Sequence, residues 1–124
     1  MARRRNNIAP RESLIQQAVI DHWKLLGEPN TLVAAIPNQK AFGQPGLTKG
    51  LPDLLVMGPR VPGHCHAGFL ELKRDRRSPV TEDQKNFARL CLDLGIAIAI
   101  AYGRDEPIRV LEDWGVVRPA RAAA

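Results

Sequence analysis

Apolar residues along the first fifty positions predict a helix, a strand and a loop. Between residues 11 and 26 they recur every three or four positions, which is the period of an amphipathic helix. Gly27 and Pro29 follow and predict where that helix ends. Residues 32–36 form a short apolar run typical of a buried strand, whereas residues 38–50 contain three glycines and little apolar periodicity. We therefore expect a mobile, solvent-facing loop after the first strand.

The middle of the chain predicts a hairpin followed by a second helix. Residues 53–57 and 68–73 are strand-like runs separated by turn-forming glycines and prolines, so we expect them to pair antiparallel. Thr81 with Gln84 three residues later is a capping-box pattern, and the acidic residues between them suit the positive end of a helix dipole. This helix should run to Leu94, because a glycine follows there.

The last third of the chain predicts one more strand and a short helix. Over residues 96–101 isoleucine alternates with alanine, which places small side chains on one strand face, where a helix can approach closely. Residues 108–114 fit a short helix. The order helix, strand, strand, strand, helix, strand, helix predicts an α/β (α+β) fold with a mixed sheet flanked by helices. We expect a single domain over residues 11–117, with a flexible basic arm at 1–10 and a frayed tail at 118–124.

Composition indicates the class of binding partner and the cellular compartment. The 124 residues, 44% of them hydrophobic, suffice for one core. Lysine and arginine number 18 against 13 acidic residues, and the formal charge of +5 favours a polyanionic partner such as nucleic acid. No apolar run approaches the roughly 18 residues that a membrane span requires, so we expect no membrane association. Cys65 and Cys91 make no disulfide framework, which suits a soluble protein of the reducing cytoplasm with both thiols free.

The strand at residues 69–73 carries the most informative chemistry. Its alternation sends Glu71 and Lys73 to one face together with Phe69. Charges inside an apolar strand cost stability unless they are paired or exposed, and such violations tend to mark functional sites. Asp53 precedes Glu71 by 18 positions, and a hairpin of that size can return the two carboxylates side by side. A structural alternative is an edge-strand ion pair with Asp53 capping a turn, but the ordered set favours the functional interpretation.

Two carboxylates beside one lysine suit hydrolysis of a phosphodiester. Hard oxygen ligands hold Mg²⁺ or Mn²⁺, and such an ion stabilises charge on the scissile phosphate and the leaving oxygen. The backbone carbonyl of Leu72 can supply a further oxygen ligand, while Lys73 positions the attacking water or helps to deprotonate it. We expect no small-molecule cofactor. We also expect no zinc site, because the adjacent ligands in the sequence His64-Cys65-His66, which fits a hairpin tip, lack the spacing of structural zinc sites.

These motifs resemble those of a known nuclease superfamily. Pro52-Asp53 followed by Glu71-Leu72-Lys73 is similar to the PD-(D/E)XK pattern, and the context of residues 49–56 and 69–73, with Gln84, resembles the VRR-NUC branch. The likeness spans about residues 11–114. It implies a restriction-endonuclease-like fold, dependence on a divalent metal, and structure-selective cleavage of DNA, with the stand-alone members from phages and bacteria resembling Holliday-junction resolvases.

The resemblance also implies roles for individual residues. Asp53 and Glu71 become metal ligands and Lys73 the catalytic lysine. Glu12 corresponds to the acid of the first helix, which would approach the metal directly or through a water; equally, it fits an acid that complements the helix dipole. Gln84 would point at the active site, and the alternative for it is a capping bond back to Thr81.

Basic residues near these motifs are candidates for contacts with DNA phosphates. A solvated charged loop would show the same pattern. His22 lies on the apolar stripe of the first helix, which indicates a satisfied core or interface histidine rather than a general base. The candidates for phosphate contact are Arg3, Arg4, Arg5, Lys40, Lys49, Arg74, Arg76 and Arg77.

The expected partner is DNA, in a branched form. A domain of this size covers little of a junction, and two symmetric cuts need two active sites, so we expect a homodimer. A non-catalytic DNA-binding module with a nuclease fold is one alternative, which the intact set of Asp, Glu and Lys disfavours. An RNA-directed nuclease is another. Aromatic residues form only 5% of the chain, which disfavours base recognition by stacking.

Overall fold

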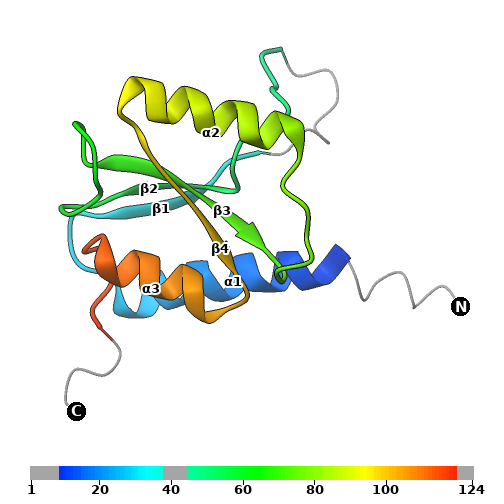
Figure 1. Cartoon of the computed structure of the whole chain (residues 1–124). Helices are drawn as coiled ribbons and strands as arrows, with labels where there is room; N and C mark the ends of the chain where they lie inside the picture. The colour runs from blue at the N-terminus through cyan, green and yellow to red at the C-terminus, as the bar shows by residue number, and fades with distance from the viewer. Residues whose placement is uncertain (1–8, 38–44, 120–124) are drawn as a thin grey trace, which may run out of the picture.

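The computed structural model describes residues 9–37 and 45–119, and within them the chain forms one mixed four-stranded sheet with three helices (Figure 1). The strand order in the sheet follows the sequence. The first three strands pair antiparallel, and the fourth pairs parallel to the third. The α+β fold and the hairpin predicted from the sequence are thereby confirmed. The elements are α1 (Ala9–Leu26), β1 (Leu32–Ala35), β2 (Leu54–Met57), β3 (Ala67–Lys73), α2 (Glu82–Leu94), β4 (Ala97–Tyr102) and α3 (Asp105–Asp113).

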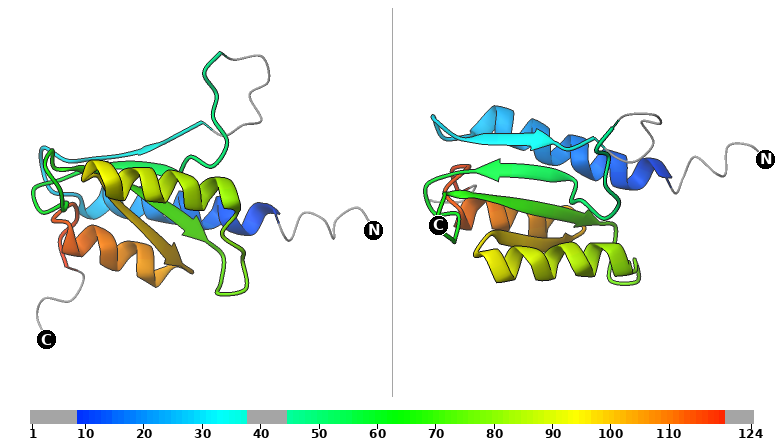
Figure 2. Two further views of the ribbon diagram at one scale, coloured as in Figure 1. Left: turned by 45° about the horizontal axis from the view of Figure 1, so that its top comes forward. Right: turned by 90° about the horizontal axis from the view of Figure 1, so that it is seen from above.

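The helices lie on both faces of the sheet. Helices α1 and α3 cover one face, and α2 lies on the other (Figures 1 and 2). The main core lies beneath α1 and α3, where the alanines of β4 let the helices approach: Ala101 is buried, and Ala97 and Ala99 pack against the same cluster. The alternation of isoleucine and alanine therefore has the structural effect that the sequence predicted. The core cluster includes Ile15, Val19, Val33, Leu54, Val56, Leu70, Leu72, Leu111, Trp114, Val116 and Val117.

Helix α2 is closed at both ends by the signals that its sequence carries. Thr81 and Gln84 form a complete capping box at its start. Gly95 ends it in the left-handed region at φ 75°. In the middle of the helix, the ring of Phe87 meets that of Phe69 on β3 edge to face, with centroids 5.1 Å apart. These contacts set the first turn of α2 beside the end of β3.

Two helices begin earlier than their apolar patterns suggest. Helix α1 begins at Ala9 rather than near Arg11, so residues 9 and 10 of the predicted arm are helical; Pro10 is tolerated because the first turn has no backbone acceptor for its nitrogen. Helix α3 begins at Asp105, three residues before the predicted start at Ile108. Its first turn is polar apart from a proline, and such turns give no apolar period.

Several expectations lie outside the described residues. They concern residues 1–8 of the basic arm, residues 38–44 of the loop and residues 120–124 of the tail. Within the described ranges, none of the helices combines the length and the apolar character needed to cross a bilayer.

Candidate active site

The β2–β3 hairpin brings two carboxylates together. Leu54 pairs with Leu70, so Asp53 lies one position beyond the ladder and opposite Glu71. The Oδ2 atom of Asp53 accepts a hydrogen bond of 2.7 Å from the backbone N–H of Leu72. This bond fixes Asp53 at the end of the strand pair. Because the buried leucines occupy the core face, both carboxylates lie on the other face of the sheet.

Lys73 completes a buried polar cluster with Glu71. Only 5% of Glu71 and 6% of Lys73 is exposed, and the Nζ atom of Lys73 lies 3.4 Å from Oε2 of Glu71. The same Nζ donates to Oε1 of Gln84 at 2.9 Å, while Nε2 of Gln84 donates to Oε2 of Glu71, also at 2.9 Å. Burying two charges is costly unless they are paired and hydrogen-bonded, and here they are both.

Gln84 serves the helix and the cluster at the same time. Its Oε1 atom accepts from the backbone N–H of Thr81 at 3.0 Å, and its own backbone N–H donates to Oγ1 of Thr81 at 3.1 Å. The sequence left a capping role and a role at the site as alternatives. The structure shows that one side chain makes both sets of contacts.

One carboxylate oxygen of the cluster stands apart from its hydrogen-bond network. Oε1 of Glu71 is buried and accepts no hydrogen bond from the described residues. Burial and the neighbouring charge of Asp53 raise the pKa of Glu71 to about 7, against the opposing effect of Lys73. Burial also raises the pKa of Asp53, although its bond from Leu72 acts in the opposite direction. The pair therefore favours a proton, or another positive charge, between its oxygens.

The cluster opens into a hollow of about 320 Å³. Glu12 from α1 and Lys49 from the loop before β2 line it together with Asp53, Glu71 and Lys73. Both added side chains are exposed, and the charge of Glu12 contributes to the raised pKa of both Asp53 and Glu71. Glu12 also lies in the first turn of α1, where it complements the helix dipole, so its two interpretations are compatible.

The backbone of Leu72 points toward the same end of the hairpin. In a strand, the N–H and the C=O of one residue point to the same side. The N–H of Leu72 binds Asp53, whereas the carbonyl of the next residue, Lys73, accepts from Gly103 on the opposite side. The carbonyl of Leu72 is therefore directed toward Asp53. Leu72 and Asp53 also line a neighbouring hollow that reaches Glu12.

The donor set suits a hard cation that keeps part of its water shell. No three His, Cys, Asp or Glu side chains within residues 9–37 and 45–119 are close enough to hold a metal together. Asp53 and Glu71, with the carbonyl of Leu72, offer three oxygens. Mg²⁺ is commonly held by one or two carboxylates with waters in the remaining positions.

The candidate phosphate contacts have different environments. Lys49 lines the hollow of the cluster, and Arg77 lines an adjoining hollow with Lys73. Arg74 lines that second hollow too, and its Nε lies 3.7 Å from a carboxylate oxygen of Asp75. Arg76 is engaged elsewhere, by an ion pair with Glu106 and by its position over the ring of Tyr102. The remaining candidates, Arg3, Arg4, Arg5 and Lys40, lie outside the described residues.

Sequence reasoning missed several residues that line the site, among them two at the start of α2. Thr81 and Asp83 both border the hollow, although their sequence pattern indicated only helix capping and dipole effects. The sequence-based prediction that Gln84 points at the active site could have identified both residues. Once its side chain is aimed at the cluster, the rest of the same helical turn must lie beside it.

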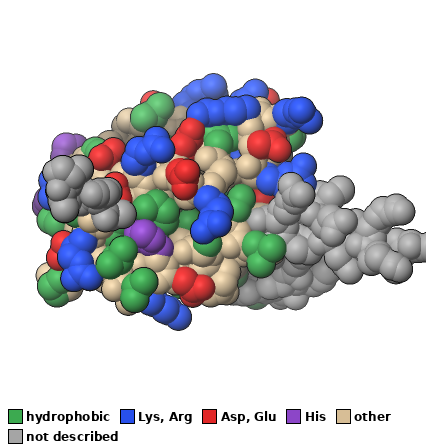
Figure 3. Space-filling view, turned by 90° about the horizontal axis from the view of Figure 1, so that it is seen from below, with side chains coloured by type: hydrophobic (Ala, Val, Ile, Leu, Met, Phe, Trp, Pro, Cys, Tyr) green, Lys and Arg blue, Asp and Glu red, His purple; other side chains and the backbone are tan. Residues whose placement is uncertain are grey.

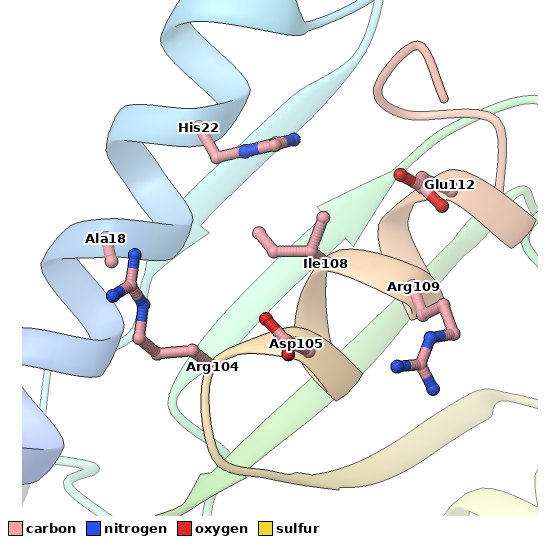
Figure 4. A pocket seen from close by; sticks show the side chains of 7 residues that line it. All are labelled: Ala18, His22, Arg104, Asp105, Ile108, Arg109 and Glu112. Atoms are coloured by element: carbon pink, nitrogen blue, oxygen red, sulfur yellow. The ribbon is translucent and has the colours of Figure 1, made fainter. Parts of the chain in front are cut away.

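A hollow between α1 and α3 lies on the opposite face of the sheet (Figure 4). His22 reaches across it from α1, and Arg104 reaches from the start of α3 toward Ala18. The Nε2 atom of His22 is buried and finds no hydrogen-bond partner among the described residues, so the expectation of a satisfied core histidine is not met within this part of the chain. Among the described residues, acidic and basic side chains are interspersed over this face (Figure 3).

The raised pKa of Glu71 predicts how pH affects stability without metal. Between pH 4.5 and about 7 the folded protein retains a proton that the unfolded chain releases. Stability from this group is therefore present at low pH and lost as pH rises through about 7. Thermal melts in chelator from about pH 5 to about pH 8 test this, with Glu71→Gln as the control. A melting temperature that falls no more in the wild type than in Glu71→Gln would contradict it.

Comparisons with known proteins identify the fold. No protein-family model matches the chain, and neither does any curated protein. Solved structures do match, among them two with the same domain name. One, described as "VRR_NUC domain protein", is 23% identical with a TM-score of 0.69, over 83% of this chain and 86% of that one. The other, "VRR_NUC domain", is 21% identical with a TM-score of 0.59, over 82% and 95%. The chain therefore has the fold of VRR_NUC domain proteins, which confirms the resemblance at the level of fold.

Proposed function

We propose that this chain, which has the fold of VRR_NUC domain proteins, is a nuclease of that type that depends on a divalent metal and hydrolyses the phosphodiester bonds of DNA. The observation that carries the proposal is the cluster of Asp53, Glu71 and Lys73 at the end of the hairpin, open to a hollow. A buried charged cluster contributes little to stability, because the cost of removing the charges from water offsets their attraction. Its position, next to exposed basic side chains, suits a reaction at a phosphate.

Asp53, Glu71 and the carbonyl of Leu72 are the groups that would hold Mg²⁺ or Mn²⁺. The fit rests on the buried Oε1 of Glu71, which has no hydrogen-bond partner within residues 9–37 and 45–119, and on the raised pKa of both carboxyl groups. A cation supplies the positive charge that these oxygens lack. When bound, such an ion polarises the scissile phosphate and stabilises charge on the leaving oxygen. Glu12 is the group that would reach the ion's water shell.

Lys73 is suited to act on the attacking water or on the phosphate. An ammonium group has three N–H donors, and Gln84 and Glu71 take two of them. The remaining donor can hold a water oxygen or a phosphate oxygen. In hydrolysis the water oxygen bonds to phosphorus, the bond from phosphorus to the leaving sugar oxygen breaks, and the water's proton ends on that sugar oxygen. Lys73 contributes by orienting the water and by offsetting negative charge as it develops.

We also propose that the substrate is branched DNA and that two copies act together in the cytoplasm. Lys49, Arg74 and Arg77 are the described side chains best placed to contact phosphates beside the cluster. One active site cuts one strand, so paired cuts across a junction require a second copy. Sedimentation of the protein with and without a four-way junction tests the stoichiometry.

The deciding experiment is a cleavage assay on a panel of labelled nucleic acids. The panel contains a four-way junction, a flap, duplex DNA, single-stranded DNA and a matched RNA hairpin, each with Mg²⁺, Mn²⁺ or chelator. We expect metal-dependent cutting with a preference for the branched DNA. Cutting of the RNA alone would favour the RNA-directed alternative. Binding of every substrate without cutting in either metal would instead favour a non-catalytic DNA-binding module.

A further inference from the structure

The amide of Gln84 is held in one orientation by three partners. Its oxygen accepts from the backbone N–H of Thr81 at 3.0 Å and from Nζ of Lys73 at 2.9 Å, while its nitrogen donates to Glu71 at 2.9 Å. A flipped amide would face two donors with its nitrogen and a carboxylate with its oxygen. All three bonds would be lost. Lys73 and Glu71 are long side chains with several rotatable bonds, so the backbone of Thr81 is the rigid reference among the three.

Thr81 holds that reference in place with its own side chain. Its hydroxyl accepts from the backbone N–H of Gln84 at 3.1 Å, and its backbone is extended, with φ −72° and ψ 165°. The first N–H groups of a helix have no partners within the helix, and a turn whose cap is removed tends to fray. The hydroxyl therefore keeps the N–H of Thr81 aimed at the amide oxygen.

The same helical turn is pressed against the loop that leads to Asp53. Gly50 has φ +87°, and a Cβ atom there would lie 2.6 Å from the backbone carbonyl of Asp83. The close approach therefore requires glycine. It places the first turn of α2 against the chain three residues before Asp53. The cap and this contact together locate Gln84 relative to both carboxylates.

We propose that Thr81 is a positioning residue for the candidate active site. By capping α2 it fixes the orientation of the Gln84 amide. The amide in turn holds the ammonium of Lys73 and the carboxylate of Glu71 in fixed positions relative to each other. The inference rests on the proposed nuclease function for its kinetic consequence. The orientation of the amide itself does not depend on that function.

Two substitutions at Thr81 and one distant control test the proposal. Thr81→Val keeps the shape and the backbone N–H but removes the hydroxyl, and Thr81→Ser restores the hydroxyl. Gly95→Ala is the matched control at the opposite end of α2. It strains the left-handed cap at φ 75° and lowers the stability of the same helix without touching the cluster. Melting temperatures of all three variants measure how much stability Thr81→Val and Gly95→Ala each lose.

The first readout is kinetic, with a branched DNA substrate and Mg²⁺ or Mn²⁺. We expect Thr81→Val to lower kcat by about tenfold with KM changed by less than about twofold, because misplaced catalytic groups affect the chemical step. Thr81→Ser should recover most of the rate, and Gly95→Ala should retain the rate of the wild type. Equal losses in Thr81→Val and Gly95→Ala, or no loss in either, would show that the cap acts only through stability.

The second readout needs neither metal nor DNA. The side-chain amide protons of Gln84 are followed by NMR, with Gln84→Glu used to assign them. In the wild type the Gln84 amide proton that is hydrogen-bonded to Glu71 should exchange slowly with water. This exchange should be faster in Thr81→Val, whereas Gly95→Ala should leave the exchange rate unchanged. Unaltered exchange in Thr81→Val would overturn the proposal. A wild type that cuts no DNA but shows this pattern would leave the positioning intact and remove only the nuclease assignment.

Discussion

Asp53→Asn is expected to lower metal-dependent cleavage by about a thousandfold, which corresponds to several kcal/mol of lost transition-state stabilisation. The amide keeps the shape of the side chain, and its oxygen can still accept the 2.7 Å bond from the N–H of Leu72. It removes the negative charge that a cation at this position needs. The measurement is single-turnover cleavage of the preferred substrate at saturating protein, so that weaker binding does not contribute.

The same substitution should stabilise the protein when metal is absent. The charge of Asp53 is one of the causes that raise the pKa of Glu71, so its removal relieves repulsion within the cluster. We expect Asp53→Asn to have a higher melting temperature than the wild type in chelator. The difference between the two melting temperatures should shrink or change sign when Mn²⁺ is added, because the metal stabilises the wild type more. A variant that retained the rate of the wild type would exclude Asp53 as a ligand. One that melted far lower would show a structural role instead.

Lys73→Met is expected to lower the cleavage rate by about a hundredfold or more. This is the range that general acid–base groups contribute to the rate of an enzyme reaction. Methionine retains much of the volume and the apolar stem but has no ammonium group. Glu71 then lies buried without its cation, which costs up to about 3 kcal/mol when it is ionised. Because the pKa of Glu71 rises to about 7 even with Lys73 present, this loss should be large at about pH 8 and small at about pH 6.

The double variant Lys73→Met with Glu71→Gln separates chemistry from stability. It removes both charges of the pair, so it should recover stability at about pH 8, since replacing both partners avoids an uncompensated buried charge. It should remain inactive. DNA binding, measured in Ca²⁺ or without metal, should change little in either variant. If Lys73→Met cut DNA as fast as the wild type, Lys73 would be a structural partner of Glu71 and the mechanism would need another group.

Much of the fold was predictable because its signals are local. Helical and strand periods, the glycines after α1 and α2, and the capping box at Thr81 each depend on residues within one or two turns of one another. The hairpin followed from two strand-like runs and the turn between them. Predictions were weakest at the starts of α1 and α3, where the first turn is polar or contains proline and no apolar period announces it.

The chemistry of the candidate site was also visible in the sequence, as residue types and alternation. Glu71 and Lys73 stand out because charges on one face of an apolar strand demand an explanation, and Asp53 stands out because a hairpin can return it beside Glu71. Their roles as ligands and as the catalytic lysine remain predictions until the metal and the reaction are measured. The sequence could not show that Arg76 is paired with Glu106, because that partner is thirty residues away.

By itself, then, the sequence determined the elements, their order and the charged residues placed at one strand end, since each of these is a property of neighbouring positions. Only the tertiary structure decided how those residues meet. It joined Gln84 to both Lys73 and Glu71 and placed Gly50 against the first turn of α2. It also left one oxygen of Glu71 without a hydrogen-bond partner in the part of the chain that the structure describes. Such contacts depend on distances between segments far apart in the chain, which are set by packing of the sheet and helices rather than by local pattern.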